Sequence, residues 1–166
     1  MILEIDLQKL LGAVNVPADW VGIREVYEAH NPRMIRDGVP VANSRVSTHG
    51  LMVEVLVDGQ FGYFGTPKLT QEGVAEAAKK AFLQAKLASK HSLFSFDVNA
   101  RPVFKGEYIS PHKKGRDALS AGSLNKLLLD AYNSLKISDK IVSAHSLCQI
   151  IETKSKFVSS NGSDID

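Results

Sequence analysis

The chain has 166 residues, of which 44% are hydrophobic and 23% charged, and 20 basic residues against 18 acidic ones give a formal net charge of +2. A chain of this length buries enough apolar surface to fold as one domain without disulfides or a structural metal. The near-neutral charge disfavours a dedicated nucleic-acid-binding domain, and no apolar run approaches the ~18 residues of a membrane span.

The single cysteine, Cys148, excludes an internal disulfide and suits a reducing compartment. It lies in an apolar-alternating run, where a free cysteine behaves as a small buried hydrophobe. The first residues, 1–6, include acidic side chains and no basic region, so they do not resemble a signal peptide. These features predict a soluble cytoplasmic protein.

The first predicted helix is short and is followed by two strands. Asp6 can cap the helix, which ends at residues 15–17. Its apolar stripe has helical spacing: Leu7, Leu10, Leu11 and Val14. Residues 20–28 are rich in β-branched and aromatic side chains and predict a strand. Asn31-Pro32 is expected to break that strand, and residues 33–36 to form a second one.

Residues 37–65 carry the densest β signal. Asp37-Gly38 and Asp58-Gly59 are pairs typical of two-residue hairpin turns. The strands expected around them cover residues 41–48, 51–57 and 60–64. His49-Gly50 lies between two of these runs and is expected to form a bulge or turn. The glycines of residues 59–65 indicate bulges or close backbone approach.

Two longer helices are predicted on either side of an irregular loop. Thr70 caps the first, and its stripe keeps helical spacing: Val74, Ala77, Ala78, Ala81, Phe82 and Ala85. Residues from about 89 to 119 show no clear periodicity and predict a crossing loop. Ser120 or Ser123 caps the second helix, which carries a leucine-rich stripe.

The last part of the chain predicts two strands and a hairpin. Residues 141–153 alternate with apolar even positions, Lys154-Ser155 is expected to turn the chain, and residues 156–160 form the final strand. Asn161-Gly162 favours a type I′ turn, with positive φ at both residues, and hence a returning strand. Four residues remain for that strand, which leaves two alternatives: a frayed tail, or the front part of a longer protein.

The order of elements predicts an α+β fold in a single domain over residues 1–166. We expect a mostly antiparallel sheet of about six to seven strands with helices packed on one face, because strands and helices are segregated along the chain.

No residue of this chain is assigned a catalytic, cofactor-binding or metal-binding role. None of the five histidines has another histidine, a cysteine or an acid at metal-ligand spacing, so each is expected on a surface or a strand face: His30, His49, His91, His112 and His145. A local basic excess is either a phosphate-binding patch or a solvated loop: Lys105, Lys113, Lys114 and Arg116.

The order of the motifs resembles the N-terminal domain of the TldD/PmbA family. The resemblance rests on segments 18–25, 50–65, 69–81 and 108–111 and on the final run from Phe157 to the Asn-Gly pair. It covers nearly all of the chain. Members of this family have long been described as modulators of DNA gyrase and are regarded as zinc-metallopeptidase-related subunits.

The resemblance implies a parent protein more than twice this long, with a larger C-terminal β-rich domain. The zinc-binding His-Glu-x-x-x-His helix of the peptidase-type subunit lies in that second domain, so zinc is expected there and no cofactor in this chain. The resemblance also implies pairing with a TldD/PmbA-type subunit, as a homodimer or heterodimer, and unfolded peptides as substrates. It does not separate the metal-bearing TldD type from the metal-lacking PmbA type.

The expected function is that of a non-catalytic N-terminal domain that helps to assemble subunits and to enclose peptides. Exposed strand edges near residues 37–65 and the 89–119 loop are the surfaces expected to contact a peptide, the edges by strand addition. A stand-alone protein- or peptide-interaction module is the alternative from another class. Nucleic-acid binding through Lys113, Lys114 and Arg116 is a third, and predicts affinity that falls steeply with salt.

Overall fold

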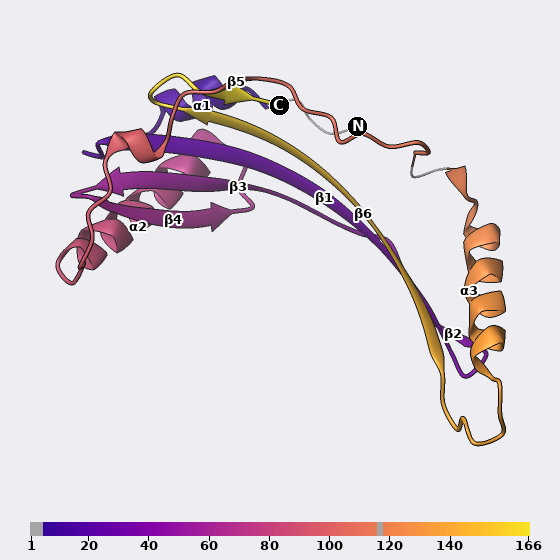
Figure 1. The fold of residues 1–166 in the computed structure, drawn as a ribbon. Helices are drawn as coiled ribbons and strands as arrows, with labels where there is room; N and C mark the ends of the chain where they lie inside the picture. The colour runs from indigo at the N-terminus through magenta and orange to yellow at the C-terminus, as the bar shows by residue number, and fades with distance from the viewer. Residues whose placement is uncertain (1–4, 116–117) are drawn as a thin grey trace. The chain divides into compact units, whose positions relative to one another are not determined.

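The computed structural model describes residues 5–115 and 118–166. These residues form three α-helices, one short 3-10 helix and a seven-stranded sheet that is mostly antiparallel, so the α+β prediction is confirmed (Figure 1). The helices are α1 (Leu7–Gly12), α2 (Gln71–Ser89), η1 (Val98–Ala100) and α3 (Ala121–Leu135). The strands are β1 (Trp20–Arg36), β2 (Val39–Asn43), β3 (Val46–Val57), β4 (Gln60–Thr66), β5 (Lys105–Gly106), β6 (His145–Ser159) and β7 (Asp164–Ile165). The sheet order is β4-β3-β1-β6-β7-β5, and β2 also pairs with β1.

The chain divides into two compact units, and β1, β3 and β6 each contribute residues to both. Unit 1 contains residues 1–27, 49–109 and 154–166, and unit 2 contains residues 28–48 and 110–153. Among the described residues, the helices are too short or too polar to cross a bilayer.

Unit 1 has the larger core, formed where α1 and α2 pack on one face of β1 and β3. Its buried members include Leu7 and Leu10 from α1, Ile23 from β1, and a set from β3 and α2: Leu51, Val53, Val55, Val57, Val74, Ala77, Ala78, Ala81 and Ala85. The alanine stripe of α2, predicted from its spacing, is thus buried. Because alanine side chains are short, the helix backbone lies close to the sheet.

α2 approaches the sheet closely at Gly62 of β4. A Cβ atom built on Gly62 would lie 2.0 Å from the carbonyl oxygen of Ala81, a contact that no side chain can make. The prediction that a glycine in residues 59–65 marks a close backbone approach is confirmed here. Gly62 pairs with the buried Val55 in the antiparallel β3–β4 register, so the helix lies directly over the hairpin.

The opposite face of unit 1 is covered by the segment that follows α2. Phe96 packs against Phe61 of β4 with ring centroids 5.4 Å apart, and the Phe96 amide donates to the carbonyl of Gly59 at 2.8 Å. The guanidinium carbon of Arg101 lies 4.4 Å from the Phe61 ring centroid. In its described part, the predicted loop of residues 89–119 contains η1 and β5 and follows directly from the end of α2 at Ser89, and its first part covers a sheet face.

Asn161 holds the C-terminal hairpin of unit 1 to the buried Trp20. Its Oδ1 accepts from the indole Nε1 of Trp20 at 2.9 Å, and its Nδ2 donates to the carbonyl of Arg101 at 2.8 Å. The hydroxyl of Ser159 donates to the same Oδ1 at 2.6 Å. One side chain therefore connects the start of β1, the covering segment and the end of β6.

The predicted hairpin exists, but its turn is not type I′. Only Gly162 has positive φ, at 98°, and the turn bond runs from the Gly162 amide to the carbonyl of Ser159. The Ser159 amide donates to the carbonyl of Ser163, which makes a three-residue loop with glycine in its left-handed last position. The returning strand is β7, paired antiparallel with β6. Both the Oδ1 and the Nδ2 of Asn161 are hydrogen-bonded. These bonds hold the backbone of Asn161, the residue directly before Gly162, in place.

Two predicted strand breaks are wrong. β1 runs through Asn31-Pro32, because proline lacks only a donor, and the Pro32 carbonyl still accepts from the Ser44 amide at 3.4 Å. β6 runs through Lys154-Ser155, whose backbone is extended and whose polar side chains are exposed. The residues preceding a proline also favour an extended backbone. Lys154 and Ser155 are polar because this part of β6 is exposed to solvent, and their composition is also typical of a turn.

The two Asp-Gly turns are confirmed and the strand bounds beside them are corrected. Asp37 and Gly38 have φ of 50° and 81°, and Asp58 and Gly59 have φ of 48° and 74°. The predicted strand 41–48 is instead divided between β2 and β3, with residues 44 and 45 outside both strands. β3 continues through His49-Gly50, where a bulge or turn was expected.

Unit 2 packs α3 against β1 and β6 through a small core. Ile35, Leu128 and Tyr132 are buried, with Ala144 and Cys148 partly buried against them. Ser120 is the cap of α3: its hydroxyl accepts from the Ser123 amide at 3.1 Å. The predicted strand 141–153 is corrected at its start, because β6 begins at His145 and Val142 is 91% exposed. Of the predicted apolar even positions, Ala144 and Cys148 pack against this core.

We predict that Gly62→Ala destabilises unit 1 by about 3 kcal/mol, because α2 must shift away from β4 to admit the new methyl group. This corresponds to a melting temperature lower by about 10 °C, measured by circular dichroism. Gly65→Ala is the matched control on the same strand, since its Cβ would meet no atom closer than 3.9 Å. Equal melting temperatures for the two variants would contradict the close approach.

We predict that Asn161→Ala costs about 2 kcal/mol in urea denaturation, because the buried Trp20 indole loses its acceptor. Faster hydrogen exchange is expected at the amides of Phe104 and Tyr108, whose partners lie beside the same hairpin. Asn99→Ala, an exposed position in η1, is the control and should leave both readouts unchanged. Exchange that accelerates uniformly over unit 1 would show that Asn161 does not anchor this segment specifically.

Candidate functional site

The outer edge of β4 is a candidate peptide-contact surface, because β4 is the terminal strand of the sheet order. In the β3–β4 register, the residues at 61, 63 and 65 direct their backbone groups away from β3. The Tyr63 amide donates to Oε1 of Gln84 on α2 at 2.9 Å, which confirms this orientation. The side chains of Tyr63 and Phe64 are 42% and 36% exposed, so aromatic surface flanks the edge on both faces.

A charged pair lies beside this edge on the face covered by the segment after α2. Nε of Arg101 donates to Oε1 of Glu54 at 3.0 Å, and its Nη2 donates to the Tyr63 hydroxyl at 3.3 Å. Burial, reinforced by the hydrogen bond and charge of Glu54, raises the pKa of Tyr63. Burial opposes the charge of Arg101, but the hydrogen bond and attraction of Glu54 outweigh it, so the pKa of Arg101 is raised as well. The pair fixes the covering segment onto the sheet.

The segment of residues 101–109, here called the returning segment, pairs with the last residues of the chain in unit 1. The Asp164 amide donates to the carbonyl of Phe104 at 2.9 Å, and the Asp166 amide to that of Gly106 at 3.0 Å. The Tyr108 amide donates to the Asp166 carbonyl at 2.8 Å. β5 therefore pairs in parallel with β7, and the returning segment occupies the edge of β7.

Two of the five histidines, each expected on a surface or a strand face, lie on strands and pair with an acid. Nε2 of His49 lies 2.7 Å from Oε1 of the buried Glu25, which brings β3 and β1 together in unit 1. In unit 2, His30 contacts Glu28 two positions before it on β1, since residues i and i+2 share a strand face. The His30 hydrogen bond, followed by that of Thr153, lowers the pKa of Glu28. The strand break predicted at Asn31-Pro32 concealed the pairing of His30 with Glu28.

Neither pair forms a metal centre in the part of the chain that the structure describes. No group of three or more histidine, cysteine, aspartate or glutamate side chains comes together there. Two ligands do not complete the tetrahedral set that zinc takes in proteins. His91, His112 and His145 are exposed, as expected for surface histidines.

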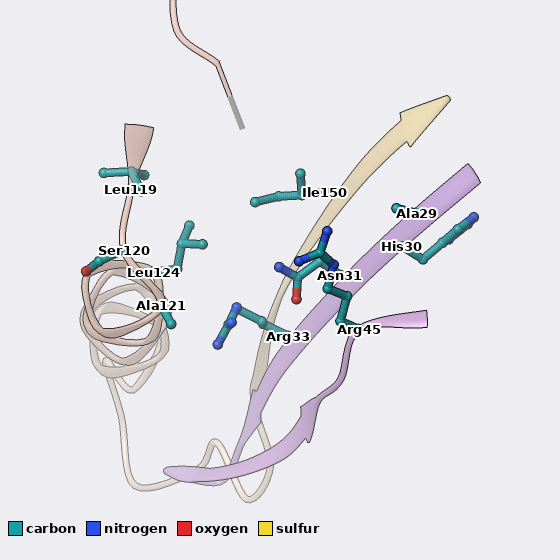
Figure 2. A pocket seen from close by; sticks show the side chains of 10 residues that line it. All are labelled: Ala29, His30, Asn31, Arg33, Arg45, Leu119, Ser120, Ala121, Leu124 and Ile150. Carbon is teal, nitrogen blue, oxygen red and sulfur yellow. The ribbon is translucent and has the colours of Figure 1, made fainter. Parts of the chain in front are cut away.

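Unit 2 contains a pocket between α3 and the strands, with a volume of about 300 Å³ (Figure 2). Arg33 and Asn31 of β1 point into it, as does Arg45, which precedes β3, whereas His30 points away (Figure 2). The N-terminus of α3, at Ser120 and Ala121, forms one wall. The remaining lining residues are mostly apolar: Ala29, Leu119, Leu124 and Ile150. We call this cavity the unit-2 pocket.

Arg33 is the least expected residue of the unit-2 pocket. It is 8% exposed; its Nη1 donates to Oδ1 of Asn125 at 3.1 Å, and its buried Nε has no acceptor among the described residues. Sequence reasoning missed Arg33 and Arg45. The available signal was Arg33 itself, which falls in phase with the buried Ala29 and Ile35 on one face of β1.

The basic residues considered for phosphate binding do not fall in one unit. Lys105 belongs to unit 1, and Lys113 and Lys114 belong to unit 2, where both are exposed. Arg116 lies outside the described residues. The arrangement gives no support to a common phosphate patch.

One protein-family model matches part of the chain, and several solved structures share its fold. The family model described as PmbA/TldA metallopeptidase domain 1 matches residues 21–85. No curated protein shows significant similarity to the chain.

Three solved structures share the fold over most of this chain. A protein from Bacteroides thetaiotaomicron, named as a modulator of DNA gyrase, is 17% identical with a TM-score of 0.65, covering 95% of this chain and 36% of its own. A protein from Thermotoga maritima with the same naming is 17% identical with a TM-score of 0.60, covering 87% and 32%. TldE from Thermococcus kodakarensis is 17% identical with a TM-score of 0.62, covering 95% and 35%.

At this identity the solved structures establish the fold alone, and the chain spans about a third of the length of each. The family match covers β2, β3, β4 and most of β1 and α2, where the sequence motifs are most distinctive. Residues 21–85 therefore match domain 1 of the PmbA/TldA metallopeptidase family, and the resemblance drawn from the motifs is confirmed.

Proposed function

We propose that this chain works as a non-catalytic N-terminal domain of a cytoplasmic TldD/PmbA-type metallopeptidase-related protein. In that role it helps to assemble two subunits and to enclose peptides during peptide maturation or proteolysis. The observation that carries the proposal is the match of residues 21–85 to domain 1 of this metallopeptidase family. Under this proposal, zinc and the hydrolytic step belong to a part of the parent protein outside these 166 residues.

The β4 edge supports the peptide-handling part of the proposal. An extended peptide adds to a sheet edge through main-chain hydrogen bonds, which do not depend on its sequence. β4 offers outward backbone groups at Phe61 and Gly65, with the Gln84 side chain already bonded to the Tyr63 amide between them. A peptide carbonyl oxygen that accepts from the Tyr63 amide in place of Gln84 would continue the β3–β4 ladder by one strand.

Rigid support of that edge is the second requirement. α2 packs over β4 at Gly62, and Arg101 holds the opposite face through Glu54 and Phe61. Because both faces are covered, the edge is presented without a large rearrangement on binding. Preorganised edges lose less conformational entropy when a peptide adds to them.

We predict that the native gene product has a mass about three times the 18.1 kDa of this chain, because the chain covers 32–36% of the solved structures it matches. Intact-mass spectrometry of the protein purified from its source measures this directly. Metal analysis should find essentially no zinc in the 166-residue chain. A native product of about 18 kDa would support the stand-alone interaction module instead, and stoichiometric zinc in the short chain would overturn the non-catalytic assignment.

We predict that an unfolded polypeptide, reduced and carboxymethylated lactalbumin, protects the amides of residues 60–66 from hydrogen exchange. Gly65→Pro should abolish the protection, because it removes an outward donor without disturbing the β3 ladder. Gly65→Ala keeps the donor and should behave as the unmodified chain. Equal protection in both variants, or protection confined to other segments, would remove the β4 edge from the proposal.

A further inference from the structure

The unit-2 pocket gathers positive charge without a negative partner among its lining residues. Arg33 and Arg45 line it, and none of the ten lining residues is acidic. Arg33 is 8% exposed, so its guanidinium charge is largely removed from water. A buried charge costs several kcal/mol unless hydrogen bonds or an opposite charge compensate it. Asn125 supplies only one neutral acceptor, through Nη1.

The unsatisfied atom of Arg33 indicates where a ligand would bind. Its Nε is buried without an acceptor, and Nε with the neighbouring Nη2 forms the side-on edge of the guanidinium. That edge matches a planar carboxylate, which accepts two parallel hydrogen bonds from it. Since Asn125 occupies Nη1, the edge left for a ligand is the bidentate one.

The N-terminus of α3 adds a second, independent attraction for an anion. The helix has 15 residues, and its cap Ser120 and first residue Ala121 lie on the pocket wall (Figure 2). The Ser120 hydroxyl accepts a hydrogen bond from the Ser123 amide, and the Ser120 carbonyl accepts one from the Leu124 amide. The amides of Ala121 and Gly122 belong to the first turn, which has no intrahelical acceptors, and the helix dipole places partial positive charge there.

The apolar lining residues of the pocket favour an apolar group attached to the anion. Ala29, Leu119, Leu124 and Ile150 form an apolar wall beside the arginines. A volume of about 300 Å³ is at the lower end of small-molecule sites and accommodates one residue rather than a nucleotide. An aliphatic side chain against this wall leaves its carboxylate facing Arg33 and the start of α3.

We propose that the unit-2 pocket binds the C-terminal carboxylate of a peptide that ends in an aliphatic residue. Arg33 takes the carboxylate side-on, the first turn of α3 donates to it, and Arg45 adds charge at the open side. The choice of a peptide as the carrier of the carboxylate rests on the proposed function. The anion site itself rests on the pocket alone, so the two are tested separately.

The experiment titrates acetyl-Gly-Leu with a free carboxylate into the ¹⁵N-labelled 166-residue chain and follows the arginine Nε–H and backbone amide signals. We expect saturable shifts of the Arg33 Nε–H and of the Ala121 and Gly122 amides. The same peptide with a C-terminal amide should cause no such shifts. Inorganic phosphate is titrated in parallel and should bind at least about tenfold more weakly than the free acid, because it lacks the aliphatic side chain.

Arg33→Lys keeps the charge but removes the side-on edge, and should weaken binding of the free acid at least about tenfold. Arg36→Lys is the matched control on the same strand, at an exposed position outside the pocket lining. Arg45 is exposed, so Arg45→Gln should leave the fold intact and weaken binding about threefold, which keeps the test valid if Arg33→Lys does not fold.

Three outcomes would overturn the proposal. Equal binding of the acid and the amide would show that the carboxylate is not recognised. Tighter binding of phosphate would make the site a phosphate site, and no shift with either peptide would leave Arg33 as a buried structural residue. Lactalbumin protection of β4 is measured in unit 1. A negative result in the unit-2 pocket therefore leaves the proposed function standing, and a negative result at β4 leaves the anion site standing.

Discussion

The close packing of α2 on the β3–β4 hairpin is the constraint on which unit 1 depends. The contact requires short side chains on both sides: an alanine stripe on the helix and glycine at position 62, where the Ala81 carbonyl lies against the strand backbone. Side chains packed at crystal-like density leave no room for an added methyl group there. The same contact determines which side of β4 remains open, because the helix covers one face and places Gln84 against the outer edge at Tyr63. The proposed peptide edge is thus a consequence of how the core is packed.

The second face of unit 1 depends on polar anchors more than on apolar burial. Arg101 joins Glu54 while lying over the Phe61 ring, and Asn161 connects Trp20 to the carbonyl of Arg101. These side chains hold a segment without regular secondary structure, whose aromatic residues Phe94 and Phe96 stay 68% and 42% exposed. A few partly buried hydrogen bonds to charged or indole groups compensate for the small apolar area. Loss of one such anchor is therefore expected to free the segment before it unfolds the core.

Local signals in the sequence predicted the helices, their caps and the two Asp-Gly turns, because each depends on residues within one or two turns of chain. The strand breaks at Pro32 and Lys154 were wrong, since the extent of a strand is decided by its neighbours in the sheet and a proline removes only one donor. The Asn161 turn shifted because a distant partner, Trp20, holds the asparagine side chain. Arg33 escaped notice for the same reason: its environment is formed by α3, about 90 positions along the chain. Chemistry that depends on long-range contacts is the part that sequence patterns do not reveal.

Because the core of unit 2 is small, the buried Arg33 affects the stability of the whole unit. Its core cluster has three buried apolar residues among the described ones: Ile35, Leu128 and Tyr132. Ala29 and Leu124 are also buried in this unit, at the pocket wall. Little apolar area therefore offsets the cost of burying a guanidinium with an unpaired Nε. A carboxylate that pairs with this atom removes the cost in the folded state only. Its binding is therefore coupled to the stability of unit 2, and by mass action a ligand at 100 times its Kd stabilises the folded form by about 2.7 kcal/mol. Under the proposal, occupancy of the unit-2 pocket would order α3 against β1 and β6, so that recognition of a peptide end and consolidation of the unit are one event.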